Sequence, residues 1–254
     1  MTTNNNEHLK TLFQKILPGT VMLAGSLIKL GISRDLQQYY KKSGWIKSIG
    51  SGAFIRAHDK TEWDGGIYAL QNQEKLNIYP GGLTALTLQG FSHYVRLNET
   101  NICIFYSNCH VPKWLKAHDW GKNLEFYMAN FLPNDLALSE YASNNFTINI
   151  SSPGRAILEC LYLSPLKIDL IECYHIIEGL ANLRPALIQE LLEKCTSIKV
   201  KRLFLYMARK ANHAWFKYID VSKIDLGSGV RSIIKEGAYD REYRITMPKE
   251  LKEL

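Results

Sequence analysis

One predicted helix carries polar side chains of the kind that read DNA bases. Arg34, Gln37, Gln38 and Lys41 recur at helical spacing, and this spacing places them on one face of an α-helix. Arginine and glutamine form paired hydrogen bonds with the edges of guanine and adenine in the major groove. The face therefore indicates base recognition, although an ordinary solvated helix surface has a similar composition.

The other residues of this helix define its limits and its inner side. Ser33 is a typical N-cap, which places the helix at residues 34–42. Leu36, Tyr39 and Tyr40 lie three and four positions apart, so we expect them to face the protein core. The polar face would then point to solvent, where DNA can reach it.

A β-hairpin is predicted directly after this helix. Two β-prone runs, 45–49 and 53–56, flank a glycine-rich turn at residues 50–52. Basic and hydroxyl side chains on such a hairpin are suited to contact the phosphate backbone beside the groove. The candidate DNA-binding residues of helix and hairpin are Ser33, Arg34, Gln37, Gln38, Lys41, Lys42, Lys47, Ser48, Ser51 and Arg56.

Two further helices are expected before the candidate recognition helix. Apolar residues at helical spacing predict one helix at 9–17, which Pro18-Gly19 ends, and a second at 21–30. Gly31 follows where a helix C-terminus favours a left-handed residue. Three helices with a tight turn between the last two, followed by a hairpin, are typical of a winged helix-turn-helix.

The rest of the chain predicts strands mixed with helices and then a helix-rich end. Apolar spacing and glycine or proline breaks predict helices at 63–79, 83–89, 155–163, 170–179, 185–195 and 198–210. Extended segments are expected at 94–97, 101–106, 146–150, 219–226 and 241–247. Residues 113–116 favour no element.

The fold class predicted from these elements is α+β, in two domains. Residues 1–95 would form the winged helix-turn-helix domain with the helices that follow it, and residues 96–254 a mixed α/β, helix-rich C-terminal domain. The net charge is +7, and both ends are basic while residues 96–150 are nearly neutral. A basic excess favours an anionic partner, either a nucleic acid or an acidic protein.

A second basic cluster lies in the predicted helix at 198–210. Lys199, Lys201 and Arg202 follow one another closely there. One interpretation is a contact surface for an acidic partner or for additional DNA. The other interpretation is an ordinary solvated helix face, and the sequence leaves both open.

The sequence offers little support for catalysis. Cys109-His110 has no second ligand pair at a zinc-like spacing. The runs Gly50-Ser51-Gly52 and Gly227-Ser228-Gly229 lack the lysine and hydroxyl residue of a phosphate-binding loop. We therefore expect no enzyme activity, no catalytic residues, no cofactor and no metal.

The expected cellular location is the cytoplasm. Five cysteines form an odd set without a disulfide-like pattern, which favours a reducing compartment. The first seven residues are polar and lack the apolar stretch of a signal peptide. We find no segment long and apolar enough to span a bilayer, so no membrane association is expected.

An ordered set of motifs along nearly the whole chain resembles the AbiEi antitoxins of type IV (abortive-infection) toxin-antitoxin systems. The motifs are Gly31-Ile32-Ser33, Tyr40–Ile46, Ile49–Gly52, Ala69–Gln71, Tyr79–Leu86, Gln89–Tyr94, Ser151–Glu159, Leu183–Pro185, Leu191-Leu192 and Val200–Leu205. The set is specific, although each motif alone is weak. One departure is Gly154, where the family pattern suggests an acidic residue after Ser-Pro.

The resemblance implies a repressor of its own operon that also neutralises a cognate nucleotidyltransferase toxin without requiring a stable complex. Because each chain has one recognition helix, we expect double-stranded DNA with an inverted repeat in its own promoter as the target. Residues from about 96 onward would provide the antitoxin activity. The alternatives are a winged-helix module for protein interaction and a transcriptional regulator unrelated to a toxin.

Overall fold

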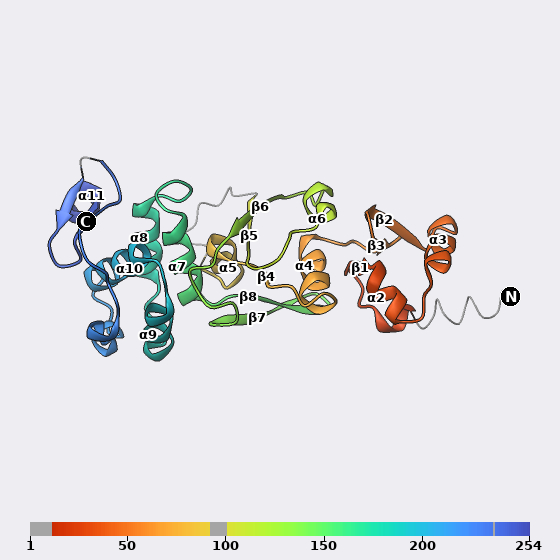
Figure 1. Ribbon diagram of the computed structural model, residues 1–254, viewed down its shortest axis with the longest axis horizontal. Coiled ribbons are helices and arrows are strands. Elements are labelled where there is room, and N and C mark those ends of the chain that lie inside the picture. Colours follow the sequence, from red (N-terminus) through yellow and green to blue (C-terminus); the bar gives the residue numbers. More distant parts are fainter. Residues whose placement is uncertain (1–11, 92–100, 236) are drawn as a thin grey trace. The chain divides into compact units, whose positions relative to one another are not determined.

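The structure, a computed structural model, describes residues 12–91, 101–235 and 237–254 and divides into two compact units that alternate along the chain (Figure 1). The N-terminal unit comprises the residues up to Tyr79, Tyr106–Phe126 and Glu140–Asn149. The C-terminal unit comprises Pro80–Phe105, Tyr127–Ser139 and Ile150–Leu254. The domain boundary expected between residues 95 and 96 lies outside the described residues.

The N-terminal unit begins with helices followed by a hairpin. In chain order its first elements are a helical turn at residues 12–15, β1 (Met22–Leu23), α2 (Ala24–Lys29), α3 (Arg34–Lys42), β2 (Ile46–Gly50) and β3 (Ala53–Arg56). β3 pairs antiparallel with both β1 and β2, so the strand order is β1-β3-β2. The predicted helix at 34–42 and the predicted hairpin are confirmed.

The predicted helix at 21–30 starts later than expected, because its first residues are extended. The side chain of Gln73 accepts a hydrogen bond from the Leu23 amide at 3.0 Å and donates one to the Val21 carbonyl at 2.7 Å. These contacts, together with pairing of β1 to β3, satisfy backbone groups that a helix would have used. A tertiary contact from fifty residues away thus overrides the local helical pattern.

Local signals correctly positioned α3 between its caps. The hydroxyl of Ser33 accepts a hydrogen bond from the Leu36 amide at 3.2 Å, as an N-cap does. Gly31 has a φ of 86°, the left-handed conformation that glycine adopts without a steric penalty. The turn that joins α2 to α3 is therefore fixed at both of its ends.

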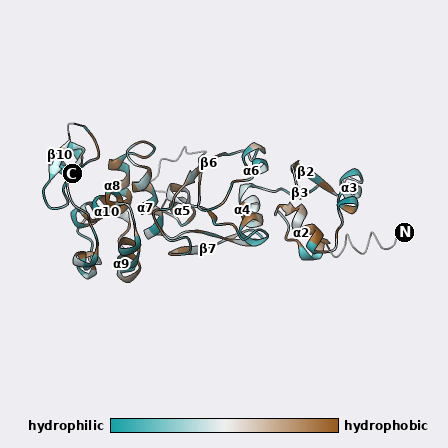
Figure 2. Ribbon diagram, in the orientation of Figure 1, coloured by the Kyte–Doolittle hydropathy of each residue, from teal (hydrophilic) through white to brown (hydrophobic). Residues whose placement is uncertain are grey.

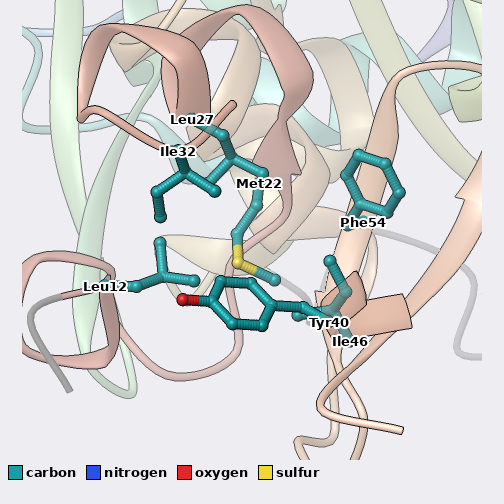
Figure 3. Close-up of a cluster of buried hydrophobic side chains, with 7 residues drawn as sticks. All are labelled: Leu12, Met22, Leu27, Ile32, Tyr40, Ile46 and Phe54. Atoms are coloured by element: carbon teal, nitrogen blue, oxygen red, sulfur yellow. The ribbon is translucent and has the colours of Figure 1, made fainter. Parts of the chain in front are cut away.

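A single apolar cluster holds these first elements together (Figure 3). Its buried side chains come from the helical turn, β1, α2, the α2–α3 turn, α3 and the hairpin: Leu12, Met22, Leu27, Ile32, Tyr40, Ile46 and Phe54. Complete burial of a large apolar side chain stabilises a fold by about 1.5–3 kcal/mol. The cluster therefore fixes the position of α3 relative to the hairpin.

Later segments of the chain complete the N-terminal unit. α4 (Trp63–Asn72) ends earlier than the predicted helix at 63–79, since Lys75 adopts a φ of 55° that a helix cannot continue. The unassigned residues 113–116 belong to α6 (Lys113–Ala117). β7 (Leu138–Ser143) and β8 (Phe146–Ser151) form a two-stranded sheet.

A further sheet has the strand order β4-β5-β6. Its strands are β4 (Ile78–Pro80), β5 (Asn101–Tyr106) and β6 (Asn123–Met128). The strand predicted at 101–106 is confirmed, whereas β4 occupies the end of the segment predicted as helix. The strand predicted at 94–97 lies outside the described residues.

Most of the C-terminal unit is helical. Its main helices are α5 (Gly82–Leu88), α7 (Pro153–Leu163), α8 (Leu170–Gly179), α9 (Pro185–Lys194) and α10 (Ile198–Lys210). The unit ends with η2 (Phe216–Tyr218), η3 (Val221–Lys223), β9 (Arg231–Ser232), β10 (Ala238–Asp240), β11 (Ile245–Met247) and α11 (Lys249–Glu253). The predicted helices are confirmed within two residues, and the mixture of helices and sheets agrees with the predicted α+β class.

The extended segment predicted at 219–226 is wrong. Its first half folds into the short 3-10 helix η3, because the carboxylate of Asp220 accepts hydrogen bonds from the amide and the hydroxyl of Ser222. Such a local bond from an aspartate to the backbone stabilises a turn in place of a strand. Only residues 245–247 of the other C-terminal prediction, 241–247, form a strand, β11.

A buried ion pair on α7 joins three parts of the C-terminal unit. The Glu159 carboxylate accepts hydrogen bonds from Gly82 N at 2.9 Å, Ser151 Oγ at 2.7 Å and Arg155 Nε at 3.0 Å. Nearby, a Cβ on Gly154 would lie 2.6 Å from Cδ1 of Ile188 on α9. A side chain at position 154, acidic or not, would therefore require Ile188 to shift.

Candidate nucleic-acid interface

The outer face of α3 is polar and basic, and Figure 2 colours this helix mostly teal. Its exposed residues include Ser33, Arg34, Gln38, Lys41 and Lys42. Neither Arg34 nor any of the three lysines at 41, 42 and 47 forms an ion pair or side-chain hydrogen bond with the residues that the structure describes. Their charges are therefore available to an external anion.

Gln37 does not belong to this face, so its predicted exposure and base contact are wrong. The side chain is 3% exposed. Its Nε2 donates to the carbonyl oxygens of Ala24 at 3.2 Å and Ile32 at 3.0 Å. The amide thus links α3 to the start of α2 and to the turn between the helices, and it positions the helix instead of reading a base.

Tyr39 is exposed where Gln37 was expected to be exposed, so the two residues have the reverse of their predicted burial. It was predicted to face the core, but the side chain is 47% exposed, whereas Tyr40 is 1% exposed. Trp45, directly after the helix, is also 46% exposed. These two aromatic side chains border the basic face, and sequence analysis missed both, because an aromatic residue on an amphipathic helix usually indicates the core side.

The hairpin adds exposed polar residues next to α3. Lys47, Ser48 and Ser51 are exposed on β2 and on the turn that follows it. β2 itself is supported by α6, because a Cβ on Gly50 would lie only 2.5 Å from Cβ of Trp114. This close contact accounts for a glycine at position 50, where φ is 153°.

Arg56, in contrast, is a structural residue, and its predicted phosphate contact is not supported. Its Nη2 donates to the carbonyl oxygens of Phe13 and Ile16. The guanidinium also lies 4.7 Å from the centre of the Phe13 ring, with Nε 3.7 Å from the Asp59 carboxylate. The side chain therefore closes the C-terminal end of the first helical turn and is not free to bind DNA.

Two of the three residues of the second basic cluster are buried, which contradicts both interpretations for Lys201 and Arg202. Arg202 is 1% exposed and Lys201 is 2% exposed. The Arg202 guanidinium donates to four backbone carbonyl oxygens, at 2.8–3.1 Å, which belong to Leu226, Gly227, Gly229 and Arg244. This cation holds the segment after η3 and the residue before β11 against α10.

Lys199 has a similar structural role at the other end of α10. Its Nζ donates to the carbonyl oxygens of Tyr162 at 2.7 Å and Ser164 at 2.6 Å. A cation at these last carbonyls stabilises the C-terminus of α7 through the helix dipole. Burial lowers the pKa of this lysine, as expected for an ammonium group withdrawn from water.

Other kinds of site receive no support from the described parts of the chain. No cluster of three or more histidine, cysteine, aspartate or glutamate side chains there could hold a metal ion. The five cysteines are free thiols. No helix among the described residues combines the length and the hydropathy needed to cross a membrane.

Comparisons with known proteins are consistent with this geometry. Residues 5–97 match the model of the "Transcriptional regulator, AbiEi antitoxin N-terminal domain", and residues 99–248 match the model of the "Transcriptional regulator, AbiEi antitoxin, Type IV TA system". No curated protein matches the sequence.

One solved structure shares the fold along nearly the whole chain. It is the crystal structure of the RV2827C protein from Mycobacterium tuberculosis, with a TM-score of 0.60 and 11% sequence identity. The alignment covers 96% of this chain and 89% of the other. The two family models together span almost the entire sequence, and the protein therefore belongs to the AbiEi antitoxin family of transcriptional regulators of type IV toxin-antitoxin systems.

Proposed function

We propose that the protein is a transcriptional autorepressor whose N-terminal winged helix-turn-helix binds double-stranded DNA at an inverted repeat in its own promoter. The observation that supports this most directly is the unpaired basic surface on α3 and the adjacent hairpin. The order of helices and strands is the one that winged helix-turn-helix modules have, with α3 in the place of the recognition helix.

Positions on α3 suggest a division of roles among the exposed residues. Arg34 and Gln38 lie one turn apart on the same face, so they are the proposed base contacts. The lysines at 41, 42 and 47 and the serines at 33, 48 and 51 are the proposed phosphate contacts, because a charge or a hydroxyl there reaches the rim of a groove. Gln37 and Arg56 are hydrogen-bonded within the protein and are not among the proposed contacts.

We further propose that the protein counters a cognate nucleotidyltransferase toxin in the cytoplasm, without requiring a stable complex with it. Family membership supports an antitoxin in general. The activity is assigned to residues from about 96 onward, because the C-terminal unit has an extensive helical core that DNA binding does not need. Lys201 and Arg202 of α10 are buried and are therefore excluded as its surface.

The decisive experiment is footprinting of the full chain on the DNA upstream of its own gene. We expect a protected inverted repeat that Arg34→Ala protects only at about 5- to 150-fold higher protein concentration. Lys122→Ala, a control that removes an exposed charge elsewhere in the N-terminal unit, should protect it as the parent does. Absence of any protected site at low salt and high protein concentration would reject the proposal.

A protein-interaction module is the second candidate, favoured by the exposed aromatic side chains of Tyr39 and Trp45. Aromatic residues are enriched at protein interfaces. The two candidates differ in salt dependence, since DNA binding weakens steeply with salt through counterion release. If α3 binds a protein, Tyr39→Ala should weaken that binding more than Arg34→Ala does.

A further inference from the structure

A cavity of about 300 Å³ opens on the N-terminal unit, and none of the residues proposed to contact DNA lines it. It lies between the residues that follow the first helical turn, helix α2 and helix α4. Its apolar lining includes Ile16, Leu17, Leu30 and the ring of Tyr68. A volume of this size lies at the lower end of the range for small-molecule sites.

Two polar side chains that line this cavity already form hydrogen bonds within the protein. The hydroxyl of Thr20 donates to the Leu17 carbonyl oxygen at 2.7 Å. Both ends of the Gln73 amide are bonded to the backbone of residues 21–23. The side chains of Thr20 and Gln73 therefore have their partners within the protein, and Ser26 and Asn72 are the other uncharged polar residues of the lining.

Two lysines, Lys15 and Lys29, stand among the residues that line the cavity. Neither ammonium group makes an ion pair or a side-chain hydrogen bond within the described chain. Leu17 and Leu30 are 37% and 36% exposed, so apolar surface reaches the opening beside these charges. The cavity thus combines an apolar wall with unpaired positive charge.

We propose that this cavity binds a small organic carboxylate with an apolar body. The apolar part is removed from water against Ile16, Leu17 and Leu30, which supplies most of the affinity. The carboxylate accepts charge-assisted hydrogen bonds from Lys15 and Lys29. A neutral ligand would lose the hydrogen bonds to the lysines, and a purely polar anion would lose the apolar contact. The site therefore favours an acid with an apolar body.

This site differs from the DNA surface in its chemistry, and the two share no residue. Lysines that bind phosphate need no apolar wall beside them, whereas here the wall is formed by side chains from three segments of the unit. The proposal does not rest on the proposed function, because binding is measured on the free protein. Failure of one leaves the other unaffected.

The test is isothermal titration of the full chain with octanoate, with octanol as the neutral analogue. We expect octanoate to bind with a dissociation constant of about 1 mM or below, as a ligand of its size permits, and octanol to bind more weakly. Lys15→Gln and Lys29→Gln should each weaken octanoate binding about tenfold. The matched control Lys122→Gln, an exposed lysine of the same unit, should not.

Three outcomes would overturn the proposal. The first is no measurable octanoate binding by a folded chain. The second is equal loss in Lys122→Gln, which would indicate non-specific attraction to positive charge. The third is a self-association, measured by sedimentation, that Leu17→Glu abolishes, because a second copy of the chain would then occupy the cavity. A monomeric Leu17→Glu variant that repels octanoate supports the site.

Discussion

Helices α3 and α10 both have closely spaced basic residues in the sequence, and they use them in opposite ways. On α3, Arg34 and the two lysines at its C-terminal end are exposed and unpaired within the described structure. On α10, Lys201 and Arg202 are almost completely buried. The difference lies in their neighbours, since α10 is apolar on most of its circumference while α3 has few apolar residues. Charge spacing alone therefore does not distinguish a binding face from a structural cation.

The largest effect that tests this comparison is expected at Arg202. Arg202→Met removes the donors to four backbone carbonyl oxygens and should lower the free energy of unfolding by ~3–5 kcal/mol, because each acceptor left without a donor costs about 1–3 kcal/mol where it stays out of contact with water. Chemical denaturation measures it. The exposed Arg231→Met is the control and should change stability by less than ~0.5 kcal/mol. If both variants were equally stable, Arg202 would contribute no more to stability than an exposed arginine does.

Arg34 is expected to give the corresponding effect on binding. Arg34→Ala should weaken binding to the operator by ~1–3 kcal/mol, the value of a base contact, while the free energy of unfolding stays unchanged because the side chain is exposed and unpaired. Fluorescence anisotropy on operator and on random DNA separates a loss of sequence-specific binding from a loss of binding to any DNA. An equal loss on both DNAs would make Arg34 a phosphate contact.

Gln37 should behave like the residues of α10, although it lies on α3. Gln37→Ala removes two hydrogen bonds to buried carbonyl oxygens and should destabilise the fold by ~1–3 kcal/mol. Operator affinity of the folded fraction should fall less than in Gln38→Ala. A variant as stable as the parent but defective in specific binding would restore Gln37 as a base contact.

The smallest effect is expected at Lys47 on the hairpin. Lys47→Ala should weaken binding to operator and random DNA about equally and reduce the salt slope by ~0.9, the value for one phosphate contact. Titrations at several salt concentrations measure this slope. If only operator binding weakened, the hairpin would contribute to sequence recognition.

The parts of the fold that sequence analysis predicted correctly are those decided by neighbouring residues. Ser33 and Gly31 determine where α3 begins and how α2 ends, and both signals are visible in the sequence. β1 was missed because Gln73, fifty residues away, holds it extended. No local pattern reports such a contact.

The candidate site could be predicted only in part, because contacts between distant residues decide which side chains of α3 and the hairpin are exposed. Leu36, Tyr39 and Tyr40 leave the rotation of α3 ambiguous, because either Tyr39 or Gln37 can complete the buried face. The structure buries Gln37, whose amide finds two carbonyl acceptors. Arg56 and Arg202 were misassigned because their guanidinium groups bond mainly to backbone carbonyl oxygens, which every residue carries and which no sequence pattern therefore reveals.

The support of Gly50 by Trp114 has a consequence for how such regulators diversify. Recombination that exchanges residues 1–95 between two relatives transfers the hairpin but leaves Trp114 and residues 140–149 from the other parent, although all belong to one unit. A chimaera of this kind inherits a mismatched contact where a side chain has no room. If the outer face of α3 reads the operator as proposed, substitutions there leave the contact with Trp114 intact, whereas an exchanged hairpin keeps this contact only with glycine at position 50.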